Sequence, residues 1–344
     1  MMIRISTSPI VLLFLCVFSS FCDARFEAAV VLPHGDFAYD PSFAKGAAER
    51  TAAQAIAKAS RDAGKWINHV FSGATNYTMF LSTPHGIALS NDFGIYLGST
   101  ASGFADIGND VPNATKYRVR LPPIPLASQL ANSLLVNLRG ENVSGIKTSA
   151  DDSIAMPLEW GEIIPLSFLP SSDRSNYGQH CRYLIWSFPL RRLDEAERYG
   201  ADMVQELLRN GALIGRWMDQ QVAQTPMAVL ISSDLSHTHR PDGPYGYSYT
   251  SQPFDDSIAH WASDPCRHAS SLLELATKLQ PTALSCGYTG LVLLHGMLCR
   301  DDAEMKDEWM SNVLDIHNVT YYGMMAATFR RKKAQESIAA AVEA

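Results

Sequence analysis

The chain has 344 residues, 47% of them hydrophobic, and a formal net charge of −7 at pH 7. This length and apolar content are enough to bury one large core or two smaller ones. The negative charge and the absence of a long basic run argue against a nucleic acid as partner.

The first 24 residues differ in composition from the rest of the chain. Arg4 precedes an apolar stretch at 10–18 that is too short to span a bilayer. Cys22 and Ala24 place small residues where cleavage before Arg25 requires them. Residues 1–24 are therefore predicted to be a signal peptide, with a short membrane anchor as the alternative. The mature protein is then expected to be secreted or to reside in the secretory-pathway lumen. No later stretch has the roughly 18 apolar residues of a transmembrane helix, so no membrane span is expected after signal removal.

Entry into the secretory pathway would make four Asn-x-Ser/Thr motifs acceptors for N-linked glycosylation. They begin at Asn76, Asn113, Asn142 and Asn318. The mature chain also keeps four cysteines, for which three complete pairings exist. The sequence leaves open both the pairing and the presence of free thiols among Cys181, Cys266, Cys286 and Cys299.

The mature chain begins with a predicted βαβ unit. The apolar runs at 28–32 and 79–83 are predicted to be buried strands. Each run ends at a Pro-His-Gly turn, which carries His34 in the first case and His85 in the second. Between them, residues 41–66 are rich in alanine and in Lys, Arg and Glu, which is typical of an amphipathic helix. Two strands joined by such a helix are expected to be parallel.

The rest of the chain continues this alternation. Residues 91–98 are expected to lead into a loop rich in Gly, Ser and Ala, residues 157–166 to be a loop running into a strand, and residues 241–254 to be a loop. Strands are predicted at 117–121, 183–189, 227–232 and 321–329, and helices at 125–139, 193–221, 255–261, 268–279 and 285–298. The alternation predicts a single α/β domain over 25–330, followed by a polar tail or frayed helix at 331–344.

Three histidines follow predicted buried strands. His34 and His85 would lie side by side if their strands are neighbours, and His237 follows the strand at 227–232. Ligands bind at the carboxyl ends of strands in open α/β sheets, and imidazole suits iron, copper and zinc. His34 and His85 are therefore candidate metal ligands, the alternative being that each imidazole only completes a turn. His237 is a candidate third ligand or acid/base group, and Asp234 either orients an imidazole or caps the following segment.

Competing catalytic motifs are missing from the sequence. It contains no HExxH helix, no Gly-x-Ser-x-Gly elbow, no P-loop and no Gly-x-Gly-x-x-Gly turn. No arginine flanks His34, so a phosphohistidine mechanism is not expected.

Five motifs occur in a characteristic order: LPHGDF, STPHGI, ISSDLSH, GPYGY and ALSCGYTGLVLLHGML. Together they resemble the superfamily of class III extradiol ring-cleavage dioxygenases, and the related Memo proteins, over residues 28–329. The resemblance implies a single α/β domain with a mixed, mostly parallel β-sheet flanked by helices. It also implies iron(II), which these dioxygenases use to insert both atoms of dioxygen into a catechol-type ring beside the two hydroxyls.

The resemblance assigns roles to individual residues and shows two departures. His34 and His85 match the family's metal ligands, and His237 its acid/base histidine, with Asp234 beside it. Cys286 stands where the dioxygenases have a third ligand, a glutamate, and where the Memo proteins have a cysteine. A thiolate favours copper or zinc more than a carboxylate does, although Cys286 is equally compatible with a buried small residue.

The second departure concerns the substrate side of the site. Trp160 replaces a histidine that binds substrate and oxygen in the dioxygenases, and an indole N–H cannot exchange protons. Glu159 or Glu162 would compensate, unless each is a solvated loop carboxylate.

Two functions therefore follow from the sequence. One is a metal-dependent oxygenase that acts on a small aromatic, catechol-like substrate with dioxygen. The other is a non-catalytic, Memo-like protein that binds a metal ion or a peptide. The sequence is compatible with a homo-oligomer.

Overall fold

The computed structural model describes residues 26–74, 76–108, 116–169, 181–193, 201–222, 225–300 and 309–332. The predicted signal peptide, Asn113 and all but the first two residues of the predicted tail lie outside these ranges. Asn76, Asn142 and Asn318 are exposed or partly exposed, and their glycosylation stays a prediction. Within the described ranges, no helix has both the length and the apolar character needed to cross a bilayer.

An eight-stranded mixed sheet forms the centre of the fold, in the order β10-β11-β1-β9-β2-β8-β3-β6. Four of the seven strand pairs are parallel and three antiparallel, which confirms the predicted α/β class. The strands are, in sheet order, β10 (Trp309–Asn318), β11 (Gly323–Arg331), β1 (Ala28–Leu32), β9 (Met227–Ser232), β2 (Tyr77–Thr83), β8 (Cys181–Ser187), β3 (Phe93–Tyr96) and β6 (Val143–Ile146).

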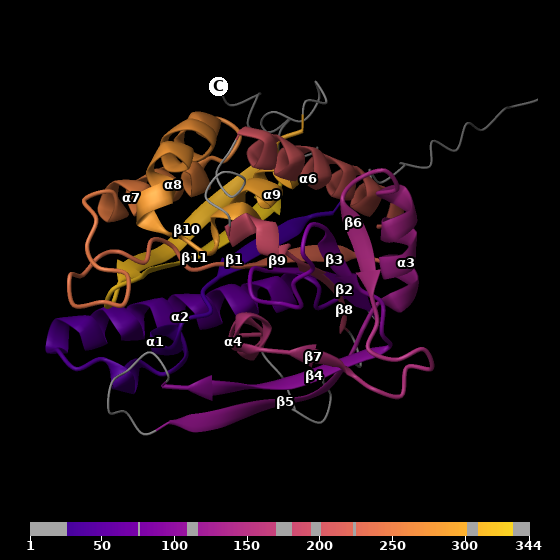
Figure 1. Cartoon of the computed structure of the whole chain (residues 1–344), viewed down its shortest axis with the longest axis horizontal. Helices are drawn as coiled ribbons and strands as arrows, with labels where there is room; N and C mark the ends of the chain where they lie inside the picture. Colours follow the sequence, from indigo (N-terminus) through magenta and orange to yellow (C-terminus); the bar gives the residue numbers. More distant parts are fainter. Residues whose placement is uncertain are drawn as a thin grey trace, which may run out of the picture.

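Helices cover both faces of this sheet (Figure 1). Alternate side chains of each central strand enter different cores: Ala29 and Val31 pack on one side of β1, Val30 and Leu32 on the other. The first side is covered by α3 (Ser128–Asn137), α6 (Ala201–Gln221), α7 (Ser251–Ser263) and α9 (Tyr288–Leu298), with a π-helix at Ser271–Ala276 and α8 (Thr277–Ala283) beside α7. The second side is covered by α1 (Asp36–Tyr39), α2 (Ala47–Val70) and α4 (Trp160–Ser167).

A second sheet of three strands lies beyond α4 (Figure 1). It consists of β4 (Thr100–Ile107), β5 (Tyr117–Pro125) and β7 (Met156–Leu158), in the order β5-β4-β7. The predicted loop after residue 98 is therefore wrong. The β4 segment lacks a continuous apolar run because it is only partly buried, and pairing with β5 and β7 makes it a strand.

Two further differences from the sequence-based expectations matter for the site. Residues 160–167 form helix α4 rather than a strand, because Glu159 and Glu162 make a capping box that starts a helix. The apolar residues of α4 are buried on every side, so they showed no helical periodicity. The antiparallel strand β10 was not predicted, since its side chains are mostly only partly buried.

Strand β9 lies between β1 and β2 and is parallel to both. The first two strands are therefore not neighbours, although their predicted parallel direction is confirmed. Among the four cysteines, Cys266 and Cys299 form a disulfide, whereas Cys181 and Cys286 are buried free thiols.

Candidate metal centre

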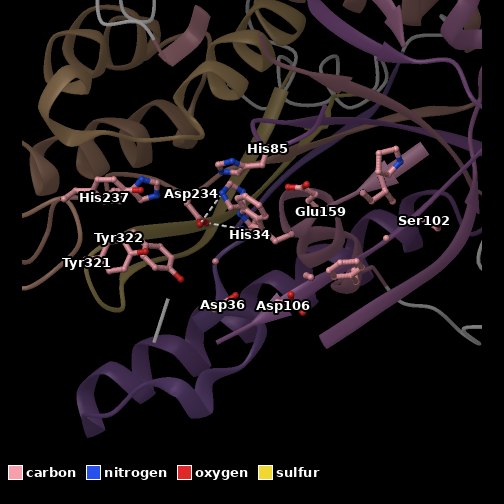
Figure 2. A pocket seen from close by; sticks show the side chains of 18 residues that line it. His34, Asp36, His85, Ser102, Asp106, Glu159, Asp234, His237, Tyr321 and Tyr322 are labelled. Atoms are coloured by element: carbon pink, nitrogen blue, oxygen red, sulfur yellow. Dashed lines mark hydrogen bonds and ion pairs between the residues drawn. The ribbon is translucent and has the colours of Figure 1, made fainter. Parts of the chain in front are cut away.

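A pocket of about 640 Å³ opens at the carboxyl ends of β1, β9 and β2. His34, His85, Asp234 and His237 line its floor (Figure 2). The second sheet and the start of α4 form one wall, and the hairpin turn before β11 contributes to the other. The three parallel strands thus deliver their terminal residues to one place, as expected for the ligand-binding edge of an α/β sheet.

His34 and His85, which line the pocket, and the buried Cys286 bring one donor atom each to one cluster. These three atoms lie within 4.8 Å of one another. Cys286 precedes helix α9, and its sulfur lies 3.2 Å from Nε2 of His34. The rings of His34 and His85 meet edge to face, with their centroids 4.8 Å apart. The structure therefore brings together the three residues that the sequence selected as metal ligands.

Asp234 contacts His34 through both oxygens of its carboxylate. One carboxylate oxygen accepts the backbone N–H of His34 at 3.0 Å, and the other lies 3.4 Å from Nε2 of its ring. Asp234 is therefore placed to orient the imidazole of His34. The carbonyl of Asp234 also accepts a hydrogen bond from the Ser285 hydroxyl, which ties this loop to the segment that carries Cys286.

His237 lies at the side of the three-donor cluster. Its Nε2 is 3.9 Å from the Cys286 sulfur, a long contact that is still within hydrogen-bond range for a sulfur atom. The backbone N–H of His237 donates to Ala283, and its ring stacks on Tyr245 with the centroids 5.7 Å apart. This ring faces the pocket beside Tyr321 and Tyr322 (Figure 2), where a bound molecule would meet it.

Burial keeps the candidate ligands in their neutral forms. It lowers the pKa of His85 to about 3, with the nearby Arg192 charge adding to the effect, and it lowers the pKa of His34 well below its usual value. Burial likewise raises the pKa of the Cys286 thiol to about 12. At neutral pH both imidazoles therefore carry a free lone pair, as metal binding requires, while the thiol keeps its proton.

Helix α4 places Trp160 and Glu159 at the mouth of the pocket. Trp160 is 42% exposed, and its ring lies over that of His85, with the centroids 4.7 Å apart. Gly161 allows this approach, since a methyl group there would meet the Cβ of His85. Glu159 is exposed and lines the pocket, as a substrate-side residue would.

Several residues at the site were missed from the sequence. Tyr322 packs so closely against Gly35 that a methyl group there would overlap its ring. Arg192 is buried behind the site and donates a hydrogen bond to the Pro84 carbonyl. Ser232, the last residue of β9, contacts His34. Two of the residues at the site lie in motifs visible in the sequence, Ser232 in ISSDLSH and Tyr245 in GPYGY.

Glu162 provides a prediction about stability. Its side chain is fully buried, and burial raises its pKa to about 8 from an ordinary value of 4.5. The folded state therefore holds this proton more tightly than the unfolded state, and its contribution to stability is lost as pH rises from about 4.5 to 8. As pH rises from 5 to 8, the wild type is therefore expected to lose on the order of a few kcal/mol of unfolding free energy relative to Glu162→Gln. Denaturant unfolding across this pH range measures the difference, with Glu159→Gln as the control at an exposed position. Unfolding free energies of wild type and Glu162→Gln that change with pH in parallel would contradict the prediction.

The similarity of this chain to known proteins is structural. No family model matches the chain, and no curated protein sequence matches it. Among solved structures, the chain is similar to that of the uncharacterized protein JW3007 from Escherichia coli K12, with a TM-score of 0.47 and 14% identity. The match covers 88% of this chain and 99% of that one.

Proposed function

We propose that this protein is a metal-dependent oxidoreductase of the extradiol dioxygenase type, which uses dioxygen to open a small catechol-like ring. The observation that carries the proposal is the convergence of His34, His85 and Cys286, two of which line a pocket together with His237. Two neutral imidazoles and a thiol fit a transition-metal ion, since all three are ligand types for iron, copper and zinc. Iron(II) follows from the resemblance, whereas the sulfur donor shifts the preference of the site toward copper or zinc.

The bound ion would supply Lewis acidity and, if it is iron or copper, a redox-active centre. The chain itself would supply shape and proton transfer. A volume of about 640 Å³ is in the range of pockets that enclose small molecules, and Trp160, Tyr245 and Tyr321 place aromatic rings in its lining. His237 is placed to take a proton from a substrate hydroxyl and to return it later.

The charge of the lining sets a preference among catechols. Among the residues that the structure describes, four carboxylates line the pocket, namely Asp36, Asp106, Glu159 and Asp234, but no lysine or arginine does. Arg118 offsets the charge of Asp106 through two hydrogen bonds, and the lining as a whole still carries an excess of negative charge. A substrate that carries its own carboxylate would be repelled, and we therefore expect neutral or cationic catechols to be preferred.

Oxygen consumption tests the proposed reaction. Protein purified without oxygen is loaded with iron(II), copper or zinc, and dioxygen uptake is measured with catechol, a catechol amine and a catechol carboxylate. The expected result is dioxygen uptake with catechol and with the catechol amine, accompanied by a ring-opened product that absorbs in the visible or near-ultraviolet. Absence of uptake with every metal would refute the proposed catalytic function.

A second function, a metal-binding protein without catalysis, is favoured by Trp160. This indole covers His85 at a position where the dioxygenases have a histidine, and it cannot exchange protons. Stoichiometric metal binding without oxygen consumption would support this second function.

Metal binding is expected to release one proton at neutral pH. The Cys286 thiol, with a pKa of about 12, must be deprotonated to become a ligand, whereas His85, with a pKa of about 3, has no proton to lose. Affinity should therefore rise about tenfold for each pH unit between pH 6 and 8. Calorimetry with zinc in two buffers of different ionisation enthalpy measures this proton, which should be missing in Cys286→Ala. Equal proton release by both proteins would exclude Cys286 as a ligand.

A further inference from the structure

The hydroxyl group of Ser232 lies between the metal centre and helix α4. Its oxygen is 2.8 Å from Nδ1 of His34 and 2.5 Å from the carbonyl oxygen of Gly161. Ser232 ends strand β9 and is fully buried, so water does not compete for either contact. Three segments that are distant in sequence therefore meet at one oxygen atom.

Counting protons assigns the direction of both hydrogen bonds. The hydroxyl carries a single proton, and a carbonyl oxygen can only accept, so the proton of Ser232 belongs to the bond with Gly161. The short contact with His34 is then a hydrogen bond only if Nδ1 of the ring carries a proton and donates it. In the opposite assignment, the serine proton would go to Nδ1, and two lone-pair-bearing oxygens would face each other at 2.5 Å.

The other face of the His34 ring is compatible with this assignment. Nε2 lies 3.2 Å from the Cys286 sulfur and 3.4 Å from a carboxylate oxygen of Asp234. The carboxylate would favour a proton on Nε2, but its contact is longer than the one between Nδ1 and Ser232. The Asp234 carboxylate also accepts the backbone N–H of His34 and is not left unpaired by a bare Nε2.

We infer that Ser232 is a positioning residue that holds His34 in the tautomer with its proton on Nδ1, and so directs the Nε2 lone pair toward Cys286 and the metal. The same hydroxyl anchors Gly161, and with it the neighbouring Trp160 and Glu159 at the pocket wall. The tautomer follows from the hydrogen bonds alone. Its consequence for metal affinity rests on the proposed metal centre.

The tautomer is tested without any metal. In protein labelled with ¹⁵N-histidine, the two ring nitrogens of each neutral imidazole show whether they carry a proton, and His34→Gln identifies the signals of His34. The expected result is a protonated Nδ1 in the wild type, and loss of this preference in Ser232→Ala. A wild-type ring with its proton on Nε2 would overturn the inference, whatever the protein binds.

The effect on affinity is tested with two variants of equal shape. Ser232→Thr keeps the hydroxyl and Ser232→Val replaces it with a methyl group, so both add the same bulk to the buried site. Zinc affinity, measured by competition with a chelating dye, should fall roughly 10- to 100-fold in the Val variant relative to the Thr variant. The cobalt(II) spectrum should also differ between the two if the geometry of His34 changes.

A location control separates positioning from general loss of stability. Ser82 on β2 is also fully buried, and its hydroxyl has no hydrogen-bond partner within the described chain. Ser82→Ala is expected to leave both the His34 tautomer and zinc affinity unchanged. Equal affinities of the Thr and Val variants would refute the role of Ser232. If the wild type binds neither zinc nor cobalt, the metal centre and the positioning of a metal ligand are refuted. The tautomer assignment is then still decided by the ¹⁵N spectra of His34.

Discussion

Removal of both imidazoles that face Cys286, in the His34→Ala, His85→Ala double variant, is expected to abolish the metal content of the protein. Two of the three converging donors are then lost, and the remaining sulfur, buried and protonated with a pKa of about 12, is a poor ligand alone. Elemental analysis of protein purified without oxygen should show about one ion per wild-type chain and none above background in the variant.

The control for this experiment removes two imidazoles elsewhere. His69 is exposed on α2 and His317 is partly exposed on β10, so His69→Ala, His317→Ala changes the histidine count equally without touching the pocket. This control should keep the wild-type metal content. Equal metal in wild type and the His34→Ala, His85→Ala variant would show that the bound ion is held elsewhere, and the proposed centre would be wrong.

Replacement of His237 by glutamine is expected to lower the rate of substrate-dependent oxygen consumption by about 10² to 10⁴, while metal content stays unchanged. Glutamine retains a polar group near the position of Nε2 but cannot take up a proton at neutral pH. His237 is not part of the three-donor cluster, and its ring is held by Tyr245 at the pocket wall. The rate loss should therefore appear without loss of the ion.

The control for the His237→Gln variant is a substitution at an exposed residue of the same loop. Tyr247 is 65% exposed and does not line the pocket, so Tyr247→Phe should retain the wild-type rate. A His237→Gln variant with unchanged oxygen consumption would remove His237 from the proton-transfer role. Loss of metal in this variant would instead make His237 a ligand.

The candidate ligands could be found from the sequence because their signals are local. An apolar run that stops at Pro-His-Gly marks a strand end and its turn within a few residues, and parallel strands place such turns at one sheet edge. The α/β class follows for the same reason, since the alternation of strands and helices is visible along the chain. Cys286 was selected through the resemblance of its motif, because one cysteine before a helix has no distinctive local pattern.

The arrangement around these ligands was decided only by the tertiary structure. Strand β9 enters between β1 and β2, although it comes much later in the chain than either of them. Such pairing depends on how the apolar faces of distant segments pack, which no local pattern specifies. The same holds for helix α4, whose apolar residues are buried on all sides, and for the bridge from His34 through Ser232 to Gly161. The sequence by itself determined which residues end the strands, whereas non-local packing decided which of them meet and what orients them.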